Sequence, residues 1–261
     1  MDEFQRLAEQ NQPIKLKVPA PDGNSVFVKL APPLLFDFPV NLQQYSSTLN
    51  TLLVDSNVLK EQNTNSMRHL LGNSKNIVRS NFDSQNINIK NEQGIFKKNS
   101  IVGKFLKLKT VSDEDKKVVV QLAHQIADIW QSGKYATDGS EPYAMPARIA
   151  LLSYKLGLST TFNCKSGKDR TGVANIEINN LAAEIEMSGG IVPEPYHALD
   201  DREMLNNNKM VNDSGANHVT EACTGLKGLK IVSKSAGGMI TFSGVKNRLG
   251  DVTGASSLAK S

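Results

Sequence analysis

The sequence predicts an α/β (α+β) fold with a cysteine-phosphatase-like core, in which a nucleophile loop lies between a strand and a helix. Two observations predict it. Apolar residues recur at helical spacing in residues 111–187, and a short β-favouring segment there leads into a tight loop and then into a helix. The hydrophobic fraction is low at 39%, while the charged fraction of 21% is ordinary. That balance indicates a folded core with long polar loops rather than a disordered chain.

The first predicted helix has a clear beginning and end. Ser112 is suited to the N-cap, and acidic residues follow it. Apolar side chains then repeat at intervals of three and four, at Val119, Leu122, Ile126 and Ile129. We expect this amphipathic helix to end near Trp130 or Gly133.

Two more helices and one strand complete the predicted core. Pro146 is expected to open the second helix, which Gly157 ends. Residues 159–163 favour a strand because Thr160, Thr161 and Phe162 are β-formers. A third helix is marked by apolar residues ending at Ile185 and is closed by two glycines, Gly189 and Gly190.

The rest of the chain is expected to elaborate this core. Residues 1–110 are rich in Asn, Gln and Ser, and we expect strands and loops there, with part of 41–100 poorly ordered. From residue 191 onward the chain is expected to be loop-rich. The prediction is therefore one phosphatase domain over 1–261, with its catalytic core at about 111–190 and elaborations at 1–110 and 191–261.

The cysteine count and the lack of long apolar stretches argue against a disulfide-rich protein and a membrane-spanning protein. Only two cysteines, Cys164 and Cys223, are present, which argues against a disulfide framework. No stretch approaches the roughly 20 apolar residues that span a bilayer, and the N-terminus lacks the pattern of a secretory signal peptide. The formal charge of +4 is compatible with an anionic substrate or membrane surface; no nucleic acid partner is expected.

The segment CKSGKDRTG carries the chemistry. Cys164 and Arg170 have the C-x5-R spacing. In such a loop the backbone N–H groups surround an anion, and the following helix adds its positive N-terminal end. The same field favours the thiolate form of Cys164, the form that attacks phosphorus to give a phosphocysteine.

The neighbouring residues each suit a part of this reaction. Arg170 can hold two phosphoryl oxygens with its planar fork, and Gly167 permits the tight turn. Thr171 can donate its hydroxyl to the sulfur as the phosphocysteine breaks down. The remaining loop residues, Lys165, Ser166 and Lys168, are candidates for substrate binding. Two lysines exceed what one phosphate needs and favour a substrate with several phosphates.

The leaving alkoxide needs a proton donor. Asp169, inside the loop, is the first candidate, although a carboxylate that pairs with a basic residue to shape the loop is nearly as well supported. Asp37 and Asp138 are alternatives on remote loops. No cofactor or metal is required, and the four histidines, His69, His124, His197 and His218, lack metal-ligand spacing.

Longer motifs connect the chain to a known family. The stretch DIWQSGKYATDGSEPYAMPARIALLSYKLGLSTTFNCKSGKDRTG strongly resembles the catalytic region of the SopB/SigD/IpgD family, type III secreted inositol phosphate phosphatases of Gram-negative pathogens. Its loop is also similar to that of mammalian inositol polyphosphate 4-phosphatases. FDFPVN resembles the family's upstream motif FNFGVNE, and SGANHVTEACTGLKGLK its downstream segment. The resemblance covers most of residues 30–261.

Four positions depart from the family pattern. Asp37 stands where the family has Asn, Pro39 replaces Gly and Leu42 replaces Glu. Cys223 occupies the usual place of an Asn. The nucleophile loop is intact, so the departures concern substrate preference rather than cleavage.

The resemblance implies a bacterial virulence effector. It implies a phosphatidylinositol 4,5-bisphosphate 4-phosphatase, or an enzyme of soluble inositol polyphosphates, secreted by a type III system into the host cytoplasm and associated with the host membrane surface. A host protein is a further candidate partner. The N-terminal secretion and GTPase-binding regions of the family are expected to be absent. Two alternatives stay open: a protein tyrosine or dual-specificity phosphatase, and a weakly catalytic module that binds host proteins or lipids.

Overall fold

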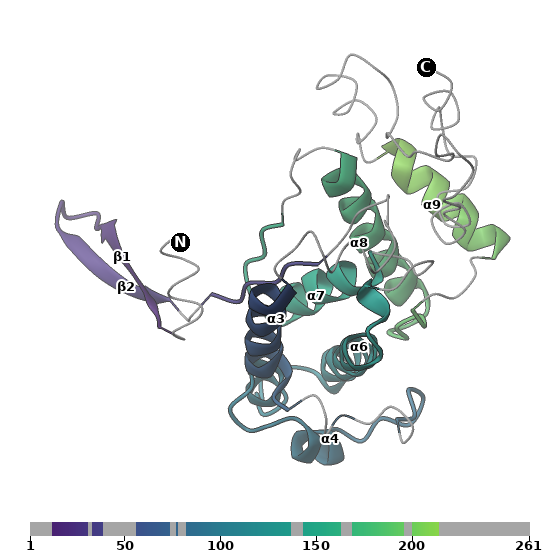
Figure 1. The fold of residues 1–261 in the computed structure, drawn as a ribbon, viewed down its shortest axis with the longest axis horizontal. Helices are drawn as coiled ribbons and strands as arrows, with labels where there is room; N and C mark the ends of the chain where they lie inside the picture. The colour runs from purple at the N-terminus through teal and green to yellow at the C-terminus, as the bar shows by residue number, and fades with distance from the viewer. Residues whose placement is uncertain are drawn as a thin grey trace.

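The structure is a computed structural model that describes residues 12–30, 33–38, 56–73, 77, 82–136, 143–162, 169–195 and 200–213. Within these ranges the chain is mainly helical, with one two-stranded sheet (Figure 1). This mixed architecture is compatible with the predicted α/β class. The strand predicted at 159–163 is wrong for Ser159–Phe162, which form no strand and are exposed. β-Favouring residues there find no partner strand in the described part of the chain.

The sheet is an antiparallel hairpin of β1 (Ile14–Pro19) and β2 (Ser25–Leu30), which extends away from the helices (Figure 1). A turn with Gly23 at φ +81° joins the strands. The register pairs Leu16 with Val28, and directly opposed residues share a face. One face is therefore apolar, formed by Ile14, Leu16, Val18, Val26, Val28 and Leu30. The other face carries Phe27 and three lysines, Lys15, Lys17 and Lys29.

Helix α6 (Asp113–Ser132) lies at the centre of the helical body (Figure 1). It confirms the first predicted helix. The Ser112 Oγ caps it by accepting a hydrogen bond from the Asp115 N–H at 3.0 Å. Gly133 ends it in the left-handed conformation, at φ +69°.

The next two helices also match the prediction. Helix α7 (Ala144–Lys155) begins two residues before Pro146, because proline is tolerated within the first helical turn. Gly157, at φ +72°, follows its end. Helix α8 (Asp169–Met187) is followed by Gly189 and Gly190, both with positive φ. Helices α7 and α8 pack against each other, and α7 also packs on α6.

Four helices correct the expectation of strands and loops outside the core. They are α3 (Ser56–Leu71), α4 (Ile89–Ile95), α5 (Ile101–Phe105) and, beyond residue 191, α9 (Asp201–Asp213). A short 3₁₀ helix, η3 (Lys134–Ala136), follows α6. The polar composition concealed α3 because part of its buried face is polar: Asn63 and Ser66 are 4% and 5% exposed.

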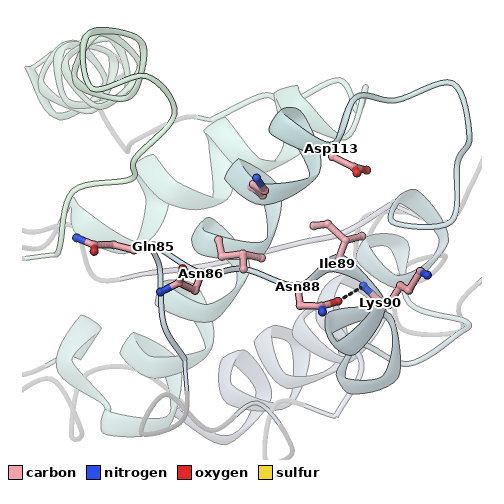
Figure 2. A pocket seen from close by; sticks show the side chains of 8 residues that line it. Gln85, Asn86, Asn88, Ile89, Lys90 and Asp113 are labelled. Carbon is pink, nitrogen blue, oxygen red and sulfur yellow. Dashed lines mark hydrogen bonds between the residues drawn. The ribbon is translucent and has the colours of Figure 1, made fainter.

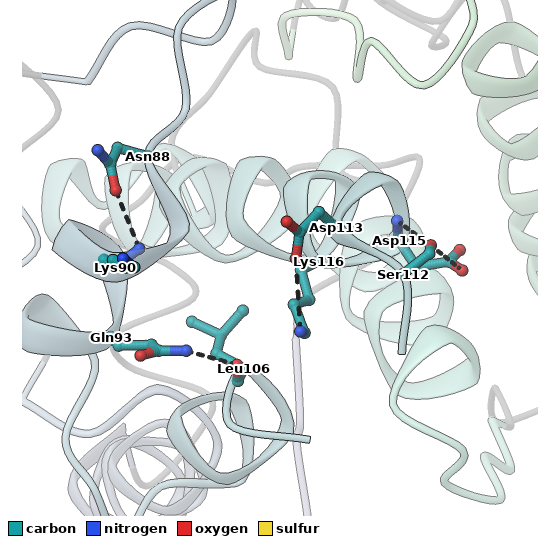
Figure 3. A network of polar contacts seen from close by, with 8 residues as sticks. All are labelled: Asn88, Lys90, Gln93, Leu106, Ser112, Asp113, Asp115 and Lys116. Atoms are coloured by element: carbon teal, nitrogen blue, oxygen red, sulfur yellow. Dashed lines mark hydrogen bonds and ion pairs between the residues drawn. The ribbon is translucent and has the colours of Figure 1, made fainter. Parts of the chain in front are cut away.

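Side-chain caps define the helices near residues 88–116 (Figure 3). The Asn88 Oδ1 accepts the Lys90 N–H at 3.0 Å and thereby caps α4. Gln93 donates its Nε2–H to the Leu106 carbonyl at 2.7 Å, which ties α4 to the end of α5. The first bond satisfies a main-chain N–H at the start of α4, and the second satisfies a partly buried carbonyl at the end of α5.

One hydrophobic cluster runs through the helical body. It joins Met67 and Leu70 of α3 and Val102 of α5 to residues of α6, α7 and α8, such as Ile126 and Leu152. Residues before 111 thus share the core of 111–190 rather than lying outside it. Helices α5, α7 and α8 line one cavity.

Candidate active site

The nucleophile loop is bounded by described residues on both sides. Cys164, Lys165, Ser166, Gly167 and Lys168 lie outside the described residues, as do the side chains of Asp169 and Arg170. The main chain of Asp169 and Arg170 forms the first turn of α8. A helix therefore begins at the end of the predicted phosphate loop, which is the arrangement that places a positive helix end beside an anion.

Both flanks of the loop line one cavity of about 540 Å³. The residues just before the loop contribute Ser159, Thr160, Thr161 and Phe162. The residues just after it contribute Thr171 and, one and two turns further along α8, Ala174 and Ile178. The described residues on both sides of the loop thus belong to the wall of one cavity.

The rest of the cavity lining comes from distant parts of the sequence. Pro33, Leu34 and Phe36–Phe38 line the cavity, and so do Ile101 of α5 and Leu30 at the end of β2. Helix α7 adds a further wall, formed by Pro146, Ile149, Ala150 and Ser153. The upstream segment FDF therefore lines the same cavity as Thr171. In the sequence, only the family resemblance connected this segment with the loop.

Helix α3 holds this upstream segment in place. The Asp37 N–H donates to Asn63 Oδ1 at 2.8 Å, and Asn63 Nδ2–H donates to the Asp37 carbonyl at 2.6 Å. Ser66 binds the main chain of Leu35 in the same way: its Oγ accepts a hydrogen bond from the Leu35 N–H at 3.0 Å and donates one to the Leu35 carbonyl at 2.6 Å. Asn63 and Ser66, three residues apart on one face of α3, thus bind the main chain of two residues that lie two apart in the extended segment.

Aromatic packing secures the other side of the segment. Phe36 and Phe38 are partly buried against the hydrophobic cluster and stack with ring centroids 5.8 Å apart. Phe38 also meets Tyr135 edge-on at 5.6 Å, and Tyr135 stacks on Trp130 at 5.0 Å. The segment is thereby fixed between α3 and the end of α6.

Among the described residues that line the cavity, Asp37 is the one with an ionisable side chain. The others are apolar, glycine, or hydroxyl residues such as Ser153 and Thr161. Asp37 as a residue is exposed, yet the cavity wall removes water from its carboxyl, and this desolvation raises the pKa of Asp37 above its ordinary value.

The family model of the enterobacterial virulence protein IpgD matches residues 1–258. The chain belongs to the IpgD family. This confirms the resemblance seen in the sequence motifs. The matched residues include both the FDF segment and the C-x5-R loop.

Individual relatives of this IpgD family member carry phosphatase names. Inositol phosphate phosphatase SopB of Salmonella bongori is 34% identical over 151 residues, 55% of this chain and 36% of the relative. SopB of Salmonella typhimurium is 28% identical over 251 residues, 96% of this chain and 40% of the relative. Inositol phosphate phosphatase IpgD of Shigella flexneri is 33% identical over 116 residues, 44% of this chain and 21% of the relative. The chain spans about two fifths of the Salmonella typhimurium protein.

A second hollow in this family member, of about 660 Å³, lies elsewhere (Figure 2). Its wall consists of residues 85–90 with Asp113 and Lys117 at the start of α6. It contains none of the residues predicted for catalysis or substrate binding, and it shares no lining residue with the first cavity. The smaller cavity is therefore the candidate active site.

Most of the other predicted candidates lie outside the part of the chain that the structure describes. Asp138, His197, His218 and Cys223 lie outside the described residues, as do Pro39 and Leu42. His124 is buried in α6, where its Nε2 lies 2.8 Å from Glu92 Oε2 and its ring stacks on Phe82. No group of three or more His, Cys, Asp or Glu side chains in the described ranges could hold a metal ion.

Asn63 and Ser66, which position the 33–38 segment of the cavity wall, were not predicted from the sequence. Asn63 and Ser66 lie three apart on one helical face, a spacing visible in the sequence. Nothing in that spacing indicates which distant main chain they bind. Similarly, no described helix is long and apolar enough to cross a membrane, in line with the absence of a long apolar run in the sequence.

Proposed function

We propose that this IpgD family member hydrolyses phosphate monoesters of inositol phosphates and phosphoinositides through a phosphocysteine intermediate. One observation carries the proposal: both flanks of the C-x5-R loop and the upstream FDF segment line a single cavity. Its volume of about 540 Å³ falls in the range of small-molecule sites, roughly 300–1,000 Å³. Relatives named inositol phosphate phosphatases support the substrate class.

The proposed reaction has two displacements. In the first, the Cys164 thiolate forms a bond to phosphorus while the bond from phosphorus to the ester oxygen breaks. Asp169 gives its proton to the departing alkoxide, and Arg170 with the N-terminus of α8 stabilises the phosphoryl oxygens. In the second, water attacks phosphorus and gives a proton to the Asp169 carboxylate, while the phosphorus–sulfur bond breaks and phosphate leaves. The Thr171 hydroxyl donates a hydrogen bond to the departing sulfur, which returns to the thiolate.

Substrate binding is assigned to the loop between these groups. Lys165, Ser166, Gly167 and Lys168 would surround the anion, and the two lysines favour a ring with more than one phosphate. The family resemblance supports phosphatidylinositol 4,5-bisphosphate, cleaved at the 4-position, as the specific substrate. The same resemblance supports action as a virulence effector, secreted into host cytoplasm and working at the host membrane, with a host protein as a further partner.

Phosphate release from a panel of substrates tests this function. The panel holds phosphoinositide vesicles, soluble inositol polyphosphates and a phosphotyrosine peptide. We expect release from the inositol substrates, loss of release in Cys164→Ser, and retention in the matched control Cys223→Ser, which changes the second cysteine of the chain.

The same panel separates the alternatives. Release from the peptide alone would establish a tyrosine phosphatase and overturn the inositol assignment. Release that is equal in the native chain and Cys164→Ser would overturn the phosphocysteine mechanism. No release from any substrate would leave the interaction module as the better description.

A further inference from the structure

Asp37 introduces a negative charge into a cavity proposed to hold a polyanion. The described elements around it, α5, α7, α8 and the segment 33–38, present no other ionisable side chain to the cavity. The cations assigned to phosphate binding, Lys165, Lys168 and Arg170, all come from the loop outside the described residues. Among described groups, the carboxyl of Asp37 therefore alone sets the charge of the wall.

The fold does not need this carboxyl to hold the segment. Asn63 binds the N–H and the carbonyl of Asp37, both main-chain groups. Phe36 and Phe38, on either side, pack into the hydrophobic cluster. The main-chain hydrogen bonds and the neighbouring aromatic rings thus hold Asp37 in place, and its carboxyl is not needed for this. A residue that contacts substrate should be supported in this way.

A carboxylate discriminates between the two kinds of substituent on an inositol ring. Ionised, it only accepts hydrogen bonds, so a ring hydroxyl can donate to it. A phosphate at the same place would bring like charges together, and their repulsion would oppose binding. The carboxyl thus favours a ring edge that carries hydroxyls.

We propose that Asp37 is a specificity-determining residue that binds ring hydroxyls and rejects substrates carrying a further phosphate on the edge that faces the 33–38 segment. This inference rests on the proposed function. It deepens that function by stating the substrate class: inositol phosphates that carry hydroxyls, and no phosphate, on the edge that faces Asp37.

The test compares a soluble inositol bisphosphate with an inositol tetrakisphosphate. Asp37→Asn keeps the size of the side chain and the main-chain anchor while it removes the charge. We expect the ratio of kcat/KM for the tetrakisphosphate to that for the bisphosphate to rise on the order of tenfold in this variant. A ratio taken within one protein cancels any general loss of active enzyme.

Glu186→Gln is the matched control. It removes the same charge from an exposed position near the end of α8, outside the cavity lining. Its ratio should equal that of the native chain. If Asp37→Asn instead lowers kcat equally for both inositol substrates and spares an aryl phosphate with a good leaving group, Asp37 is a proton donor and the specificity role is overturned.

A pH series gives a second readout. Desolvation raises the pKa of Asp37, so the native carboxyl becomes neutral at a higher pH than an ordinary aspartate. As pH falls through that pKa, the native ratio should approach the ratio of Asp37→Asn measured at the same pH, which corrects for titration of the substrates. A ratio that is equal in both proteins at every pH overturns the role of Asp37 alone, whereas absence of release by the native chain overturns the proposed function as well.

Discussion

Asn63 pairs with both main-chain polar groups of Asp37, as a neighbouring β-strand would. The two bonds measure 2.8 Å and 2.6 Å, and the Asn63 side chain is buried. The 33–38 wall of the candidate active site is therefore attached to α3.

Removing the Asn63 amide should loosen the wall. Asn63→Ala leaves the N–H and the carbonyl of Asp37 without partners, and we expect it to lower the free energy of unfolding by about 1–3 kcal/mol. Asn65→Ala is the control, because Asn65 is only part-buried and makes one long contact, 3.3 Å, to Arg68. Chemical denaturation of both variants checks this; equal losses would show that the pairing with Asp37 adds nothing.

Asp169→Asn should slow departure of the alkoxide. A positioned general acid contributes about 10²–10⁴-fold, so turnover of an inositol phosphate should fall by about that factor. With an aryl phosphate, whose leaving group needs no proton, the fall should be much smaller. Steady-state kinetics on both substrates across pH makes the comparison, and an unchanged turnover of the inositol phosphate would remove Asp169 from this role.

The start of α6 should make stability depend on pH. The pKa of Asp115 is lowered, first by the hydrogen bond from the Ser112 hydroxyl, at 2.9 Å, and then by Lys155 Nζ, at 3.1 Å. A carboxyl with a lowered folded pKa stabilises the fold above its unfolded pKa of about 4. That contribution is lost as pH falls through the folded pKa.

Asp115→Asn measures this contribution. The free energy of unfolding of the native chain should exceed that of the variant at neutral pH, and the difference should shrink as pH falls below about 4. Because the Asp115 side chain is 50% exposed, solvent screening should keep the difference under about 1 kcal/mol. Ser112→Ala should reduce the pH-dependent part while keeping the carboxyl. A difference as large at pH 3 as at pH 7 would contradict the assignment.

Two helical glycines should respond oppositely to the same substitution. A methyl group at Gly103, in α5, would overlap the carbonyl oxygen of Lys97, whereas one at Gly94, in α4, would meet no atom within 4 Å. We expect Gly103→Ala to destabilise by more than about 1 kcal/mol and Gly94→Ala to stabilise by about 0.5–1 kcal/mol. Thermal unfolding of both variants decides, and stabilisation by Gly103→Ala would show that the close approach is not maintained.

The hairpin should exchange its amide hydrogens faster than the helices. Strands β1 and β2 pair only with each other among the described residues, and isolated two-stranded hairpins are marginally stable. Residues of α6 such as Leu122 and Ile126 are fully buried. Hydrogen exchange followed by NMR should show weak protection in β1–β2 and strong protection in α6; equal protection would mean that the apolar face of the hairpin is covered.

Local signals predicted the central helices well. Ser112, Gly133, Gly157 and the apolar repeats of α6 act within a few residues of one another, so their effect can be read without knowing the fold. The error at Ser159–Phe162 has the converse cause. β-Propensity describes how side chains fit a paired strand, and this segment has no such partner in the described part of the chain.

Long-range pairing was beyond the reach of these signals. Asn63 and Ser66 are buried because they satisfy the main chain of Asp37 and Leu35, and polar residues with such partners look like surface residues in a sequence. The meeting of Asp37 with Thr171 in one cavity depends in turn on the packing of α3, α7 and α8. The C-x5-R loop predicts a chemistry, but no signal in the sequence predicted that the 33–38 segment would line the same cavity as Thr171.

The clamp of Asn63 and Ser66 also sets how the cavity can open. Because Met67, Leu70 and Leu71 of the same helix belong to the main hydrophobic cluster, the 33–38 segment cannot detach without exposing buried hydrogen-bonding groups of α3. One wall of the site therefore belongs to the most cooperative unit of the fold. The 33–38 wall should then keep its place while substrate enters, with Asp37 as its stationary reference.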